Sequence, residues 1–213
     1  MAEVDTEATV QVRGEAVIRA EPDEAVLWIA LTAIEDSPGS ALADVSKRSR
    51  ELAGLLDELG VGAADRSTGG VTVSEEFDHT SQGRRSLGHR ATGQTSVRLS
   101  DPELVGRLIS RAAEELAAQI VGPRWQIAPR NPVRLEAARE AARDAERKAR
   151  AYAEGLGVRL GRPLRLVEPG DRPVMIRAAA RSAGPESLPI DPGEQEVSAV
   201  IEVTFALEPR GGA

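Results

Sequence analysis

The stretch from Ala25 to Ile34 constrains the fold more than any other part of the sequence, because it would be apolar on both faces of an extended chain. Successive side chains of a strand point to opposite faces. One face would carry Ala25, Leu27, Ile29 and Leu31, and the other would carry Val26, Trp28, Ala30 and Ile34. The sequence therefore predicts a strand that is central in its sheet, or one that is covered on both sides by helices or by a second subunit.

Three amphipathic helices are expected around this strand. Ser37-Pro38 and Asp101-Pro102 each combine an N-cap residue with a proline at the first helical position, and Gly60 is suited to end the first helix. The third helix is predicted over Val133–Leu156. Its expected buried stripe consists of Ala138, Ala141, Ala142, Ala145, Ala149, Tyr152 and Leu156.

The remaining periodic segments predict strands, and the last of them, Glu196–Leu207, alternates cleanly between apolar and polar residues. Phe77–Gly88 is polar and contains two glycines, which favours a long hairpin loop. The predicted order is β-β-α-β-β-α-β-α-β-β. Because hairpins dominate this order, we expect an α+β fold with a mostly antiparallel sheet and three helices. The strands are expected at 9–18, 25–34, 71–73, 91–99, 123–128, 164–167 and 196–207.

One domain is expected over residues 9–207, with disordered tails at 1–8 and 208–213. Within it, residues 168–195 form a long arm rich in Pro and Gly. A segment of this length without periodicity is typical of a functional loop or an interface. Its apolar residues are the predicted oligomer interface: Val174, Met175, Ile176, Leu188 and Ile190.

The charge and the cysteine content exclude several classes of function. The formal net charge is -7, so the overall field repels nucleic acid and we expect no nucleic-acid partner. The absence of cysteine excludes thiolate metal sites and cysteine nucleophiles. The first ten residues are acidic and lack an apolar run, which predicts a cytoplasmic protein without a membrane span, or an exported one if a signal peptide was trimmed.

The only candidates for metal or ligand chemistry lie near the predicted hairpin loop. His79 and His89 are accompanied there by Glu75, Glu76 and Asp78, but their spacing matches no known zinc pattern. No nucleophile motif occurs, so we expect no enzyme activity, no catalytic residues and no cofactor. A metal-binding or small-ligand-binding role for the 75–89 loop is the alternative to a non-enzymatic interaction role.

A series of short motifs resembles the SIMPL domain family over nearly the whole chain. Gly88-His89-Arg90-Ala91 stands where that family usually has Gly-Tyr-x-Ala, so the aromatic residue is replaced. The other matching pieces are Gly14-Glu15, Ala20-Glu21-Pro22-Asp23, Leu59-Gly60-Val61, Asp65-Arg66-Ser67-Thr68-Gly69, Ala153-Glu154-Gly155-Leu156-Gly157, Leu160-Gly161, Pro192-Gly193-Glu194-Gln195-Glu196-Val197-Ser198-Ala199 and Val203-Thr204-Phe205.

The resemblance implies an α+β fold and, for bacterial members of the family, self-assembly into a ring. It implies no catalytic residues. We therefore expect a non-enzymatic protein of uncharacterised role that forms homo-oligomers, with the 168–195 arm and an exposed sheet edge in the interface.

Overall fold

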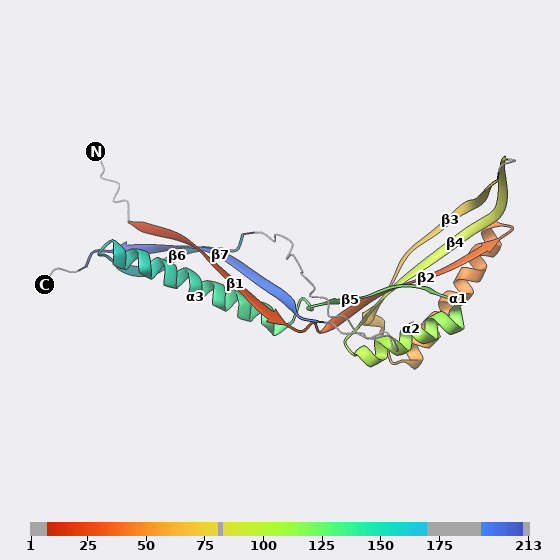
Figure 1. The fold of residues 1–213 in the computed structure, drawn as a ribbon, viewed down its shortest axis with the longest axis horizontal. Coiled ribbons are helices and arrows are strands. Elements are labelled where there is room, and N and C mark those ends of the chain that lie inside the picture. The colour runs from red at the N-terminus through yellow and green to blue at the C-terminus, as the bar shows by residue number, and fades with distance from the viewer. Residues whose placement is uncertain (1–7, 81–82, 170–192, 211–213) are drawn as a thin grey trace. The chain divides into compact units, whose positions relative to one another are not determined.

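The computed structural model describes residues 8–80, 83–169 and 193–210; for residues 78–85 it describes no side chains. The described residues fall into two compact units. The central unit holds residues 22–126, and the terminal unit holds 8–21, 127–169 and 193–210. The sequence treated 9–207 as one domain; within that span the structure contains two units, each with its own sheet (Figure 1).

The central unit is built on a four-stranded antiparallel sheet with the order β3-β4-β2-β5. Its strands are β2 (Glu24–Glu35), β3 (Arg66–Thr80), β4 (Gly83–Leu99) and β5 (Gln119–Gln126). As predicted, the strand that is apolar on both faces lies inside the sheet, between β4 and β5.

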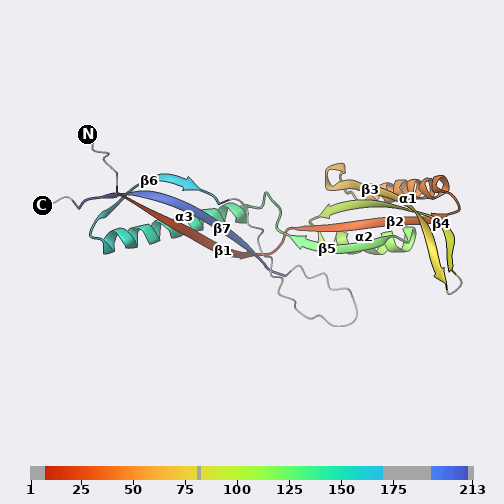
Figure 2. The same ribbon diagram turned by 90° about the horizontal axis from the view of Figure 1, so that it is seen from above.

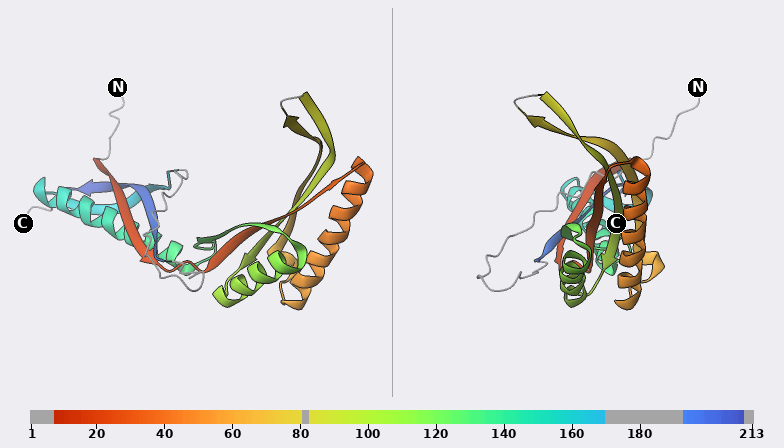
Figure 3. Two further views of the ribbon diagram at one scale, coloured as in Figure 1. Left: turned by 45° about the vertical axis from the view of Figure 1, so that its right-hand side comes forward. Right: turned by 90° about the vertical axis from the view of Figure 1, so that its right-hand side faces the viewer.

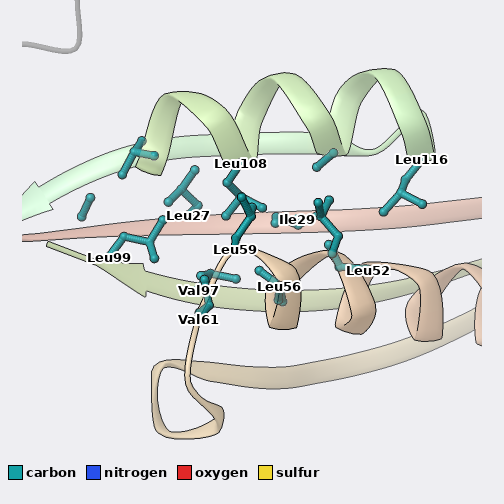
Figure 4. Packing of buried hydrophobic residues seen from close by; sticks show 14 of the residues in the cluster. Leu27, Ile29, Leu52, Leu56, Leu59, Val61, Val97, Leu99, Leu108 and Leu116 are labelled. Carbon is teal, nitrogen blue, oxygen red and sulfur yellow. The ribbon is translucent and has the colours of Figure 1, made fainter. Parts of the chain in front are cut away.

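Two helices and a short 3₁₀ turn complete the central unit: α1 (Pro38–Glu58), η1 (Ala63–Asp65) and α2 (Pro102–Leu116). Ser37 and Asp101 cap the two helices as predicted, since the side chain of each accepts a backbone N–H of the first turn. Both helices lie on one side of the sheet (Figure 3). The core between them is formed largely by leucine and valine from α1, α2, β2 and β4 (Figure 4).

The predicted loop over Phe77–Gly88 is wrong, because β3 and β4 continue through most of it as a paired ribbon. The register runs to Thr80 opposite Gly83, past the end of β2, which stops at Glu35 opposite His89 (Figure 3). Backbone hydrogen bonds hold such a ribbon whatever its side chains are, so polarity alone was a poor indicator of a loop.

The terminal unit is built on a three-stranded antiparallel sheet with the order β1-β7-β6, where β7 is the central strand. The strands are β1 (Thr9–Ala20), β6 (Arg159–Val167) and β7 (Gln195–Glu208). The apolar face of β7 alternates as predicted. β1 and β6 flank this strand, so these two are the edges of the sheet (Figure 2).

One helix, α3 (Pro132–Gly155), covers the sheet of the terminal unit. Its buried stripe is Val133, Ala137, Ala141, Ala145, Ala149 and Ala153. Of the predicted stripe, Ala141, Ala145 and Ala149 are buried, whereas Ala142, Tyr152 and Leu156 are exposed. The buried residues recur at every fourth position, which is one face of a helix. Alanine fits there because the helix lies close to β1, and a tyrosine at these positions would push the helix away.

The element order and the α+β class are confirmed. The structure differs from the prediction in the number of sheets: the strands form two separate antiparallel sheets, whereas one mostly antiparallel sheet was expected. None of the helices in the described residues combines the length and the hydropathy that a membrane-spanning helix needs.

Candidate functional site

The polar cluster that the sequence singled out lies at the start of the β3–β4 ribbon. His89 pairs with Glu75 in the ladder, and the Glu75 carboxylate accepts a hydrogen bond from Ser86 at 2.9 Å. The Nδ1 atom of His89 is buried without a hydrogen-bond partner. On the opposite face, Arg90 donates two hydrogen bonds to Glu76, and this guanidinium holds the pKa of Glu76 below its usual value.

The ladder places the two histidines on different rungs. His79 pairs with Arg84, whereas His89 pairs with Glu75, four residues earlier along β3 and about 13 Å away at the rise of a strand. The side chains of Asp78 and His79 lie outside the described residues. Within the parts of the chain that the structure describes, no three potential metal ligands gather into one cluster.

The predicted interface residues of the arm, which are Val174, Met175, Ile176, Leu188 and Ile190, all lie outside the described residues. The structure instead shows an apolar surface that the sequence analysis only partly anticipated. It lies on the face of the central sheet opposite α1 and α2, and we call it the open face.

The open face follows the second set of apolar residues of β2. Leu27, Ile29 and Leu31 point toward the helices and are almost fully buried, so the alternate residues point away from them. On that side Trp28 is 38% exposed and Ile34 is 43% exposed, and Val26 and Ala30 are half-buried.

The neighbouring strands widen the open face and surround it with charge. Val121 of β5 lies beside Trp28 in the ladder and is 67% exposed. The sequence analysis missed Val121 because it began this strand at Pro123; the β-branched pair Ile120-Val121 was the available signal. On β4, Arg98 lies beside Val26, and its guanidinium is 3.7 Å from Glu24.

The open face combines an apolar strip about 26 Å long, from Val26 to Ile34 and interrupted at Thr32, with flanking charges of both signs. Such a surface offers contact area and no reactive group.

Three comparisons with known proteins bear on this site. A family model described as SIMPL, protein of unknown function (DUF541), matches residues 10–205 and so spans both units. No curated protein matches the chain.

Two solved structures show a remote likeness. One is an amidase of the hydantoinase/carbamoylase family from Burkholderia multivorans, at 14% identity and a TM-score of 0.21, covering 62% of this chain and 33% of that one. The other is described as an amidohydrolase or peptidase from Burkholderia cenocepacia, at 19% identity and a TM-score of 0.19, covering 64% and 35%. The chain thus spans about a third of their length, and at these scores the likeness carries no argument.

Proposed function

This chain belongs to the SIMPL family of proteins of unknown function, and from that premise we propose that it is a non-enzymatic interaction protein that assembles with copies of itself. The observation that carries the proposal is the open face of the central sheet. Both helices of this unit pack on one side, which leaves Trp28 and Ile34 of the central strand partly exposed on the other.

Burial of the open face would supply the driving force for association. Apolar surface removed from water contributes about 25 cal/mol per Å². A tryptophan is the side chain whose burial at an interface is typically most favourable, together with tyrosine and arginine. Trp28 lies near the middle of β2, with Val121 beside it on β5. This placement resembles the centre of an interface, where the residues that dominate affinity are found.

A second copy of this chain is the partner that the flanking charges favour. Arg98 is paired with Glu24, and Arg90 is paired with Glu76. Because both signs occur along the apolar strip, two copies of the same face related by a two-fold axis can place opposite charges together. A uniformly charged border would instead repel its own copy.

The test is the molar mass in solution, measured by light scattering coupled to size exclusion at tens of micromolar protein. We expect a mass above the 22.6 kDa of one chain. The Trp28→Thr/Ile34→Thr double variant, which keeps strand-forming residues at both positions, should shift the mass toward one chain. The matched control is Val17→Thr, which changes an exposed valine on β1 of the terminal unit.

Two results would contradict the proposal. One is a wild-type mass of a single chain at these concentrations. The other is unchanged assembly in the double variant while its far-UV circular dichroism matches that of the wild type, because the interface would then lie elsewhere.

A further inference from the structure

A cavity of about 630 Å³ lies within the terminal unit, between the last turns of α3 and the edge strand β6. Its apolar lining comes mainly from β6 and β7, through Leu160, Pro163, Leu166, Val203 and Phe205. This volume falls in the range of small-molecule sites in proteins.

The cavity exists because α3 packs toward β1 and leaves β6 uncovered. Gly14 of β1 has no side chain, and a Cβ atom there would lie 2.0 Å from the carbonyl oxygen of Ala141 and 2.8 Å from the Cβ atom of Ala145. Ala142 and Ala153, which line the cavity from α3, contribute only short side chains.

Strand β6 also bends at the cavity. Its register with β7 shifts on both sides of Pro163, between Leu160 and Pro163 and again between Pro163 and Arg165. Bulges of this kind redirect side chains and are common next to functional sites. Leu166, beyond the second shift, is exposed although it lies on the same side of the sheet as buried Val203.

The two ends of the cavity differ in chemistry. The register pairs Arg159 with Glu208 at one end and Leu166 with Val203 at the other, about 20 Å apart at the rise of a strand. The first end also contains Glu154 and Arg210, whereas Ala142 and Pro163 line the second. The sheet side of the cavity is therefore apolar away from Arg159, whereas α3 contributes the paired Glu146 and Arg150 to the lining between Ala142 and Glu154.

The arginines at the charged end are available to a ligand. Arg159 is held by an exposed pair with Glu208, with 3.4 Å between Nη2 and Oε2, and such pairs contribute little to stability. Arg210 follows β7 and is exposed. A carboxylate matches the planar fork of a guanidinium. Glu154 at the same end disfavours a head group with two negative charges.

From the apolar sheet side and the two arginines at one end we propose that the cavity binds an amphipathic molecule with an unbranched apolar tail and a single carboxylate, the chemistry of a fatty acid. The tail lies along Leu160, Phe205 and Leu166, and the carboxylate accepts hydrogen bonds from Arg159 and Arg210. The proposal is independent of self-association, because the open face belongs to the other unit.

Calorimetric titration with dodecanoate, at concentrations where the probe is monomeric, tests this proposal on the full chain. We expect saturable binding of one dodecanoate per chain. The Arg159→Gln/Arg210→Gln double variant should bind about tenfold more weakly, because both charged donors are lost. Dodecyltrimethylammonium, which has the same tail and a positive head group, should bind more weakly than dodecanoate by a similar factor.

A variant that fills the cavity separates this site from other apolar surfaces. Ala142→Phe places an aromatic ring in the cavity from an exposed position on α3, and it should abolish binding. Ala151→Phe adds the same ring at an exposed position of α3 outside the cavity lining and should leave binding unchanged. Absence of saturable dodecanoate binding, equal binding of the cationic probe, or unchanged binding by Ala142→Phe would each overturn the proposal.

Discussion

Gly14 shows how one missing side chain positions a whole helix. The place that a Cβ atom would occupy at this residue is already taken by the backbone of α3, at 2.0 Å from the carbonyl oxygen of Ala141. The alanine stripe of α3 completes the close approach, since Ala141, Ala145 and Ala149 are fully buried. Short side chains bury little area each, so tight packing has to supply the contact energy.

At the residue scale we predict that Gly14→Ala destabilises the terminal unit by about 1–3 kcal/mol, the usual result of overpacking. Urea unfolding followed by circular dichroism would measure the change. Gly155→Ala is the matched control, because no atom lies within 4 Å of its added Cβ and alanine favours the helix. Equal stability of the two variants would mean that α3 shifts without cost and that Gly14 does not position it.

At the element scale, two side chains of α3 form hydrogen bonds with backbone groups on the unpaired edge of β1. Asp144 accepts a hydrogen bond from the backbone N–H of Glu15 at 3.0 Å, and Lys148 donates one to the carbonyl oxygen of Arg13 at 2.9 Å. Lys148 also donates to Asp144 at 2.8 Å. Unpaired groups on an edge strand can pair with another chain, so these contacts protect β1 from such pairing.

These contacts predict a pH dependence. Two hydrogen bonds hold the pKa of Asp144 below its ordinary value of about 3.9. The larger contribution comes from Lys148, and the next comes from the backbone N–H of Glu15. Because the folded pKa is the lower one, the stabilisation is complete above about pH 5, well above the unfolded pKa, and is lost as the pH falls through the folded pKa. The wild type should therefore be more stable than Asp144→Asn at pH 7, and this difference should shrink in acid.

Urea midpoints of both proteins between pH 7 and about pH 2.5 check the prediction. Glu140→Gln, which alters an exposed pair with Arg143 on the same helix, should show a small difference at every pH. A difference for Asp144→Asn that stays constant down to the lowest pH would show that its charge does not contribute.

At the scale of the whole molecule, two separate cores predict two separate unfolding events. The main core of the central unit and the main core of the terminal unit share no residue. Local unfolding follows such cooperative units. The chain nevertheless passes from the terminal unit into the central unit after Glu21 and returns at Ile127.

Hydrogen exchange measured by mass spectrometry on Gly14→Ala tests this independence. Exchange should accelerate in β1, β6, β7 and α3, while β2, β4 and α2 keep their wild-type protection. Acceleration by the same factor in all of these elements would show that the two units unfold as one.

The sequence alone determined the features that depend on neighbouring residues. The caps at Ser37 and Asp101, the inner place of β2 and the alternation of β7 all follow from local hydrogen bonding or from the period of a strand, and the structure confirms them. The resemblance to the SIMPL family rested on short motifs in order, and the family match bears it out.

Only the tertiary structure decided which strands pair and which faces are covered. The split into two sheets and the shift of the α3 stripe away from Tyr152 depend on residues far apart in the chain. So do the open face and the cavity beside β6: each exists because a helix packs elsewhere. Periodicity shows that a face is apolar, but it carries no information about what will cover it.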